Sequence, residues 1–279
     1  MELGDLFSVA GKNVLVTGGG RGIGEMIAEG LVINGCCVII SSRDLKQCEE
    51  TASRLNKLGK GKCIAIASDL GKAEGVEALA TEVAKVTEGK LHALVNNSGK
   101  AWGQPIDQFD VQKGFDDILR LNVTSVFHLT KLCVPLLEAA AAPGSPAAVI
   151  NISSIDGMRT PDAATYSYST SKTGLLALTR HLSRGLGPRN ITVNAICPGP
   201  FFTKMLASNY RPAYENWSNP DHPAVKGFKD SLSKTNPMGR LGENFDAAGT
   251  TIFLLSRAGS YVNGATINLD GGVWVGSKL

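Results

Sequence analysis

The sequence of 279 residues contains little of what disulfide-bonded, metal-binding or nucleic-acid-binding proteins depend on. Its six cysteines are scattered and none forms a CxxC pair, which favours buried free thiols in a reducing compartment over a disulfide framework. The four histidines show no ligand spacing such as HExxH, so we expect no metal site. The net charge of +3 is too small to indicate a nucleic-acid surface.

Long hydrophobic runs are also absent. No apolar run reaches about 18 residues, so we expect no membrane span. The opening MELGDLFSVAGKN does not have the charged-then-apolar pattern of a secretory signal. Together with the cysteine pattern, these absences predict a cytoplasmic protein.

The sequence does contain a regular alternation of short apolar runs and longer helical patterns. Strands are expected at 13–17, 36–41, 62–67, 91–96, 147–152, 191–196 and near 264–269. Helices are expected at 22–34, 44–58, 72–87, 110–138, 166–186 and near 245–256. The strands are continuously apolar, which is typical of a parallel sheet covered on both faces. We therefore predict one α/β domain, a doubly wound (Rossmann) sheet of seven parallel strands with helices on both faces.

A glycine-rich stretch, VTGGGRGIG, lies where the first strand passes into the first helix. A phosphate group needs exposed backbone N–H groups at a helix N-terminus, with no side chain in the way, and glycine provides that access. The spacing differs from the ATPase phosphate loop, and no lysine is placed to reach a γ-phosphate. The loop therefore predicts nucleotide binding by Gly18, Gly20, Gly22 and Gly24.

The end of the second strand indicates which dinucleotide binds. NAD would call for an acidic residue there to hold the ribose hydroxyls. The sequence has Ser41, Ser42 and Arg43 instead, and Arg21 lies in the glycine loop. Two guanidinium groups and a hydroxyl suit a 2′-phosphate, so NADP(H) is favoured over NAD(H). Asp44 is interpreted as a helix N-cap.

Asp69 and Leu70 follow the third strand and are assigned to the cofactor site. The Asp69 carboxylate could accept a hydrogen bond from the adenine amino group. A cap for the next helix is the alternative, and both interpretations stay open at this point.

Seven motifs in a fixed order make the chain similar to the short-chain dehydrogenase/reductase family. They are TGGGRGIG, NNSG (96–99), LNVTSVF (121–127), INISSIDG (150–157), YSTSK (168–172), CPGPFFT (197–203) and LDGG (269–272). The resemblance covers residues 10–275. It departs from the family's usual NNAG at Ser98, where a small residue should still fit beside the cofactor. Within the family, the sequence most resembles β-ketoacyl reductases of the rhamnolipid-pathway type.

Two tyrosines, Tyr166 and Tyr168, precede Lys172 in the stretch ATYSYSTSK (164–172). Reduction of a ketone needs a hydride from the cofactor and a proton from the protein. A free tyrosine has a pKa of about 10, and a nearby ammonium lowers it. Tyr168 lies four residues before Lys172 and shares its helical face, whereas Tyr166 does not. We therefore predict Tyr168 as the proton donor and Tyr166 as a wall of the substrate pocket.

The resemblance implies roles for further residues. Ser154 would bind and orient the substrate oxygen, with Ser153 as the neighbouring alternative, and Lys172 would also bind the nicotinamide ribose. Asn122 would hold the water that returns the proton; a satisfied core amide is the alternative. The implied cofactor contacts are Ile23 behind the phosphate loop, Asn96 and Gly99 on the adenosine side, and Pro198, Gly199 and Thr203 at the nicotinamide end.

Residues 200–236 form a long, irregular insertion that is expected to be a substrate lid on the single NADP-binding catalytic domain, residues 1–279. Its aromatic residues, Phe201 among them, suit an apolar or extended acyl substrate. Trp102 is expected on the opposite wall. The lysines of the insertion either meet the phosphates of coenzyme A or a carrier protein, or belong to a solvated face.

These observations predict an NADPH-dependent carbonyl reductase of fatty acid metabolism that acts on a 3-oxoacyl thioester. One alternative is the same mechanism on a sugar, steroid or polyketide-type ketone. Another is a catalytically silent NADP(H)-binding sensor or scaffold. The resemblance also implies a homo-oligomer, either a dimer or a tetramer, with a small-molecule substrate and no nucleic-acid partner.

Overall fold

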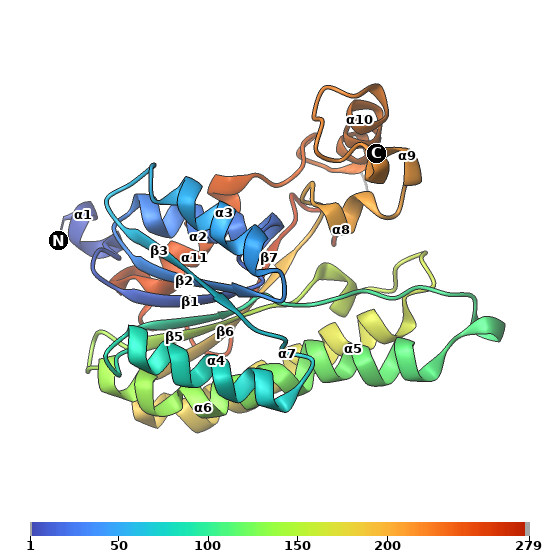
Figure 1. Ribbon diagram of the computed structural model, residues 1–279. Helices are drawn as coiled ribbons and strands as arrows, with labels where there is room; N and C mark the ends of the chain where they lie inside the picture. Colours follow the sequence, from blue (N-terminus) through green and yellow to red (C-terminus); the bar gives the residue numbers. More distant parts are fainter. Residues whose placement is uncertain (1, 277–279) are drawn as a thin grey trace.

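One seven-stranded parallel sheet organises the chain (Figure 1). The computed structural model describes residues 2–276. The strands are β1 (Asn13–Thr17), β2 (Cys37–Ser42), β3 (Lys62–Ala67), β4 (Ala93–Asn96), β5 (Ala147–Ile152), β6 (Ile191–Pro198) and β7 (Thr266–Leu269). They lie side by side in the order β3-β2-β1-β4-β5-β6-β7. The predicted doubly wound sheet is confirmed, and each predicted strand is present within two residues of its expected bounds.

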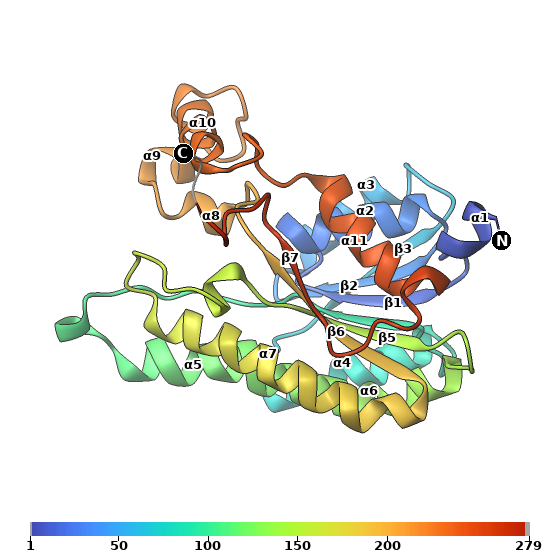
Figure 2. The ribbon, with the colours of Figure 1, turned by 180° about the vertical axis from the view of Figure 1, so that it is seen from behind.

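Helices cover both faces of this sheet (Figures 1 and 2). One face carries α2 (Gly22–Ile33), α3 (Leu45–Leu55) and α11 (Asn244–Leu255). The other carries α4 (Ala73–Val86), α5 (Asp117–Leu119), α6 (Ser125–Ala140) and α7 (Tyr166–Leu186). The short helix α1 (Leu3–Phe7) was not predicted. Single 3₁₀ turns occur at η1 (Ile106–Gln108), η4 (Ile155–Gly157), η5 (Gly187–Arg189) and η6 (Arg257–Gly259).

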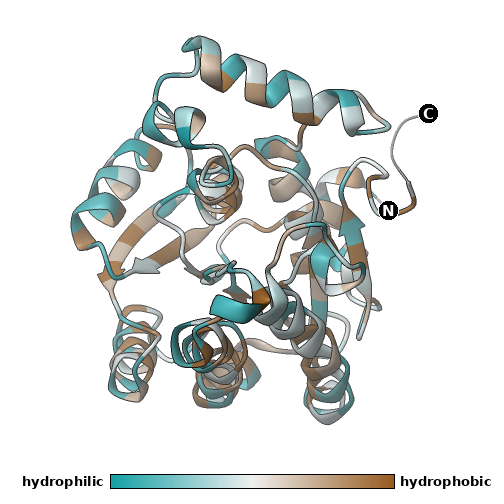
Figure 3. Cartoon of the chain, turned by 90° about the vertical axis from the view of Figure 1, so that its right-hand side faces the viewer, coloured by the Kyte–Doolittle hydropathy of each residue, from teal (hydrophilic) through white to brown (hydrophobic). Residues whose placement is uncertain are grey.

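The strands are apolar on both sides because each side faces its own core. Val14 and Val16 pack into the cluster beneath α2, α3 and α11, whereas Leu15 between them packs into the cluster under α4 and α6. Figure 3 shows the hydrophobic colours gathered in the strands and in the helices beside them. All six cysteines are free thiols, as predicted, and five of them are buried.

The chain reverses direction across the sheet between β1 and β4. From β1 it runs outward through β2 to β3, and it then returns to pair β4 with the other side of β1, with Val16 opposite Val95. The two helical connections therefore diverge at this point and leave a crevice at the carboxyl ends of the strands. The predicted site motifs follow the ends of β1, β4, β5 and β6.

The helix predicted over 110–138 is not a regular α-helix. The helical run extends over Gln112–Ala140 and contains two π-helical turns, η2 (Gln112–Asp116) and η3 (Arg120–Thr124). A π turn places one extra residue in the helix and often marks a functional site. Asn122 lies inside the second of these turns, so the extra residue occurs where a predicted site residue must turn inward.

This run is long and apolar enough to cross a membrane by length and composition alone. Core helices of globular domains meet the same criterion. Leu129, Cys133 and Leu137 are fully buried in the cluster shared with β4 and β5. The run therefore serves as a core helix of this domain.

The region predicted as irregular between 200 and 236 contains three helices. They are α8 (Lys204–Ala207), α9 (Arg211–Glu215) and α10 (Pro223–Thr235), which project from the sheet at its carboxyl edge (Figure 1). Phe201 does not line a pocket here, contrary to expectation. It is 3% exposed and belongs to the core cluster under α2 and α11. Its ring packs directly against Gly242.

Replacing Phe201 with alanine should lower the free energy of unfolding by about 3–5 kcal/mol, because it opens a cavity in a packed core. Phe245→Ala is the matched control, since that ring is 63% exposed. It should cost less than about 1 kcal/mol. Urea denaturation measures both variants, and equal small losses would contradict the placement of Phe201 in the core.

Candidate active site

The glycine loop after β1 has the backbone geometry that phosphate binding requires. Gly18 and Gly22 have φ of 65° and 59°, in the left-handed region that favours glycine. A methyl group added at Gly24 would lie 2.4 Å from the Gly18 carbonyl oxygen, so the loop packs too tightly for a side chain there. Arg21 occupies the N-cap of α2 without a capping side-chain bond, which leaves the first N–H groups of this helix for an anion.

Asn97 holds this loop against β4. Its side-chain amide donates to the main-chain carbonyls of Thr17, at 2.8 Å, and Gly18, at 3.2 Å. The neighbouring Asn96, which was assigned to the cofactor, instead donates to Thr130 Oγ1 and Asn151 Oδ1 in the core. Any contact of Asn96 with the cofactor must therefore come from its main chain. The repeated asparagine in NNSG was the available signal, but the sequence does not show which of the two faces the loop.

The end of β2 contains the groups predicted for the 2′-phosphate. The side chains of Arg21 and Arg43 are exposed, and Ser42 Oγ lies 3.1 Å from Cys48 Sγ under the glycine loop. Asp44 accepts a bond from the Gln47 N–H at 3.1 Å, which confirms its interpretation as the N-cap of α3. The Asp44 carboxylate is thus bound to the N-terminus of α3, whereas an NAD site would need an acidic side chain bound to the ribose hydroxyls.

Asp69 does not cap α4. Its carboxylate accepts a bond from the Gly71 N–H at 3.1 Å, and the N-cap of α4 is Lys72. The capping alternative is therefore wrong, and the adenine contact stays a prediction. Leu70 beside it is only 7% exposed, packed in the cluster with β2 and α4.

The opposite end of the crevice is formed by the turn after β6. Gly199 donates its N–H to the Leu269 carbonyl at 3.0 Å. Thr203 caps α8 and lies against the glycine loop, 3.3 Å from the position of a methyl group added at Gly22. The predicted phosphate and nicotinamide ends are thus adjacent, and the predicted cofactor groove runs between them. Its uncapped helix end, bare glycines and flanking guanidinium groups suit a dinucleotide carrying an extra phosphate.

The predicted catalytic residues come together beside this groove. Tyr168 and Lys172 share one face of α7, with Lys172 Nζ 5.6 Å from the centre of the Tyr168 ring. Ser154, two residues after β5, lies within hydrogen-bonding reach of the Tyr168 hydroxyl. Ser153 is turned away and donates to the Lys172 carbonyl at 2.9 Å. The structure therefore places Ser154, not Ser153, next to the tyrosine.

Asn122 joins the long helix to this group of residues. Its side chain accepts from the Lys100 N–H and donates to the Lys100 carbonyl, both at 3.0 Å, and donates to Ser171 Oγ at 3.0 Å. Ser171 in turn donates to the Tyr168 carbonyl at 2.7 Å. A methyl group added at Gly99 would lie within 4 Å of both Asn122 Oδ1 and Lys172 Nζ. The side chain is thus satisfied within the core and also lies near the predicted catalytic lysine.

Burial controls the protonation of the two central groups. It raises the pKa of Tyr168 to about 12, against a smaller lowering by the Ser154 hydroxyl. It lowers the pKa of Lys172 to about 8. Lys172 Nζ donates to the Ile152 carbonyl at 2.8 Å. Burial is the largest influence on the pKa of Tyr168, and the lowering of this pKa by Lys172 stays a prediction.

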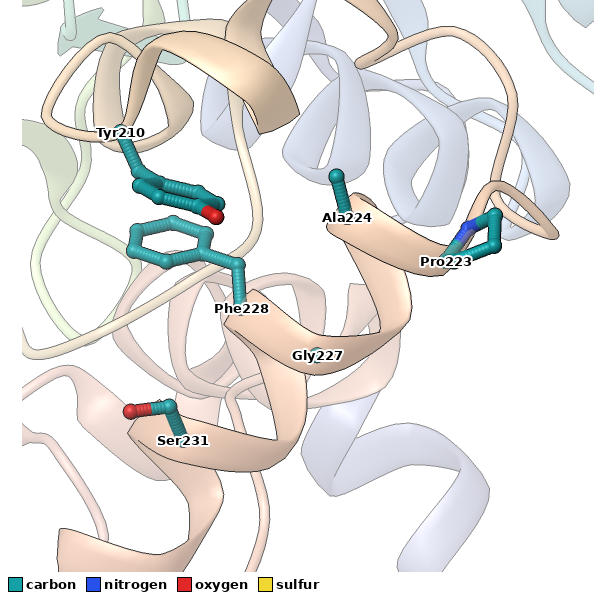
Figure 4. A pocket seen from close by; sticks show the side chains of 6 residues that line it. All are labelled: Tyr210, Pro223, Ala224, Gly227, Phe228 and Ser231. Atoms are coloured by element: carbon teal, nitrogen blue, oxygen red, sulfur yellow. The ribbon is translucent and has the colours of Figure 1, made fainter.

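The predicted substrate walls lie at the N-terminal end of α7. Tyr166 is 43% exposed and packs edge-on against Phe109, with ring centres 5.6 Å apart. Trp102 lies beside Phe109 over Gly114, and its indole N–H is buried with no partner among the described residues. On the projecting segment, the stacked rings of Tyr210 and Phe228 border a hollow of about 430 Å³ along α10 (Figure 4).

Comparisons with known proteins find similar sequences and similar structures. The family described as short chain dehydrogenase matches residues 12–213. The rhamnolipids biosynthesis 3-oxoacyl-[acyl-carrier-protein] reductase of Pseudomonas aeruginosa is 39% identical over 95% of this chain and 97% of its own. Gluconate 5-dehydrogenase of Gluconobacter oxydans is 29% identical over 97% and 98%. The solved Pseudomonas aeruginosa RhlG/NADP active-site complex superposes with a TM-score of 0.86 at 37% identity, covering 98% of this chain and 100% of that one.

Replacing Arg43 with alanine should weaken NADPH binding by about 10- to 100-fold, as expected for a lost charge-assisted hydrogen bond. NADH binding should not change, because NADH lacks the 2′-phosphate. Titration of nicotinamide fluorescence measures both cofactors without turnover. Lys46→Ala, an exposed cation on α3, is the control. Equal affinity of the unchanged protein for NADH and NADPH would contradict the assignment of Arg21 and Arg43.

Replacing Lys172 with methionine should stabilise the protein in the absence of NADP, and the gain should shrink above pH 8. Below that pH, lysine is protonated in both the folded and unfolded states, so the cost of burying its charge is constant. Between pH 8 and its ordinary pKa of 10.5, the unfolded state binds more protons, so stability rises with pH relative to the variant. The full change is about 3 kcal/mol. Urea denaturation at pH 7.5 and 10 tests this, and a constant difference would refute it.

Proposed function

The chain belongs to the short-chain dehydrogenase family, and we propose that it is an NADPH-dependent carbonyl reductase whose substrate is a 3-oxoacyl thioester. The observation that carries this proposal is the convergence of Tyr168, Ser154 and Lys172 beside the glycine-lined groove. The thioester is supported by the 39% identity to a 3-oxoacyl reductase over almost the whole of both chains. The roles proposed for individual residues rest on this same arrangement of Tyr168, Ser154 and Lys172.

In the proposed reaction, NADPH bound in the groove supplies the hydride. Ser154 donates a hydrogen bond to the carbonyl oxygen and holds it near Tyr168. The Tyr168 hydroxyl donates its proton as the oxygen becomes an alkoxide. The ammonium of Lys172 stabilises the phenolate that remains, and Asn122 binds the water that returns the proton.

Other parts of the proposal concern the surroundings of the site. We propose that residues 200–236 form a lid over the substrate, with Trp102 and Tyr166 on the facing wall. The protein would act as a dimer or tetramer in the cytoplasm. A sugar-type ketone is the second candidate substrate, because gluconate 5-dehydrogenase is similar to this chain over nearly its full length.

Oxidation of NADPH with acetoacetyl-CoA, compared with 5-ketogluconate, separates these candidates. The proposal predicts a higher kcat/KM for the thioester, whereas a preference for 5-ketogluconate would favour the sugar reductase. If neither compound nor a broader panel of ketones oxidises NADPH, the proposed enzyme activity is wrong.

Replacing Tyr168 with phenylalanine should reduce kcat at least about 100-fold, because the proton donor is lost. NADPH affinity, measured by fluorescence, should stay within about threefold, since the change removes one hydroxyl.

The matched variant Tyr166→Phe should mainly change KM for the ketone. This tyrosine is exposed beside Phe109 and does not share a helical face with Lys172. An equal loss of kcat in the two variants would remove the distinction between a proton donor and a pocket wall.

A further inference from the structure

Asn236 ends the projecting segment at a buried position. It follows the last residue of α10, and only 2% of its surface is exposed, although its neighbours on α10 are mostly solvated. Its side-chain amide donates to the Asp270 carbonyl at 3.1 Å and accepts from the Met238 N–H at 2.9 Å. A buried amide with both ends bonded holds one orientation, so this residue is a fixed point of the segment.

The turn that receives Asn236 is shaped around it. Gly271 has a φ of 64°, and a methyl group added there would lie 2.5 Å from Asn236 Oδ1. Gly272 has a φ of 91°, and a methyl group added there would lie 3.3 Å from the Pro237 ring. The Asp270 carboxylate accepts bonds from the Gly272 and Trp274 N–H groups, at 2.9 and 2.6 Å, which stiffens the turn. A rigid turn thus encloses the end of the segment.

The same turn also contacts the nicotinamide end of the predicted cofactor groove. Gly199 donates its N–H to the carbonyl of Leu269, the residue before the turn. A methyl group added at Gly199 would lie 2.6 Å from Asp270 Cβ. Asn236 and Gly199 are therefore in contact with the same residue, Asp270, from two sides. A displacement of Gly199 would therefore move Asp270, and Asp270 would move Asn236.

The beginning of the segment, residues 200–203, also contacts the predicted cofactor groove. Thr203, the cap of α8, lies against Gly22 of the glycine loop. Gly242 donates its N–H to the Pro200 carbonyl at 3.0 Å, so the two ends of the segment are joined at their base. Between these ends, α8 to α10 project from the body (Figure 1). Residues 200–236 are thus fastened at both ends, next to Gly22 and next to Gly199.

We propose that Asn236 is a positioning residue that couples residues 200–236 to the cofactor groove through Asp270 and Gly199. Occupation of the groove then restrains the segment, and the segment presents the ketone to Tyr168 only when it is held in this way. The coupling to the ketone rests on the proposed function, whereas the coupling to NADP does not.

Limited trypsin digestion with and without NADP⁺ tests the coupling. The exposed lysines Lys226 and Lys234 on α10 report on the segment. In the unchanged protein, saturating NADP⁺ should slow cleavage there at least about fivefold, because it lowers the population of open segments. In Asn236→Asp, which keeps the shape but loses the donor to Asp270, the protection should fall below about twofold, while the Kd for NADP⁺ stays within about threefold.

Asn216→Asp is the matched control, since Asn216 lies on the same segment and its side-chain amide donates to the nearby Pro212 carbonyl. It should keep the full protection. Gly271→Ala perturbs the contact from the side of the turn and serves where Asn236→Asp fails to fold; it should also lose the protection. Full protection in a folded Asn236→Asp variant, or no protection by NADP⁺ in the unchanged protein, would overturn the proposal.

Kinetics separate this proposal from the proposed function. With acetoacetyl-CoA, Asn236→Asp should raise KM at least about fivefold and leave KM for NADPH nearly unchanged, a split that a general loss of folded protein would not produce. If no ketone is reduced but protection is lost in the variant, the reductase assignment fails and the coupling stands. If the ketone is reduced and protection is unaffected, the coupling fails alone.

Discussion

The hydrogen bonds between Thr17 and the end of β4 are the constraint on which the site depends. Thr17 Oγ1 accepts from the N–H groups of both Asn97 and Ser98, at 3.0 Å each, and Asn97 donates back to the Thr17 carbonyl. These bonds join the two strands at the point where the chain reverses across the sheet. They hold the glycine loop open over the crevice, and the remaining site residues follow the ends of strands registered on this pair.

A second constraint comes from polar groups that must be satisfied inside the core. An unpaired amide or ammonium there would cost several kcal/mol. Asn122 meets this demand through Lys100 and Ser171, and Lys172 meets it through the Ile152 carbonyl. The hydrogen bonds that satisfy these buried groups therefore also fix the positions of the predicted catalytic side chains. This explains why a π turn is retained in a core helix at Asn122.

The sheet was more predictable than the segment above it. Strands and long helices follow from periodic apolar residues, a local signal that buried elements keep. Residues 200–236 have short helices whose aromatic and basic residues do not reveal which side faces inward. Phe201 was misplaced for this reason, because its burial depends on Gly242, about forty residues further along the chain.

The sequence by itself determined the sheet, the phosphate loop and the pairing of Tyr168 with Lys172, because these depend on periodicity and on spacing within single elements. Only the tertiary structure decided that Asn97 rather than Asn96 holds the glycine loop, and that Ser154 rather than Ser153 meets the tyrosine. It also decided that burial governs the pKa values of Tyr168 and Lys172. Each of these depends on what distant parts of the chain place around a residue, which local spacing does not specify.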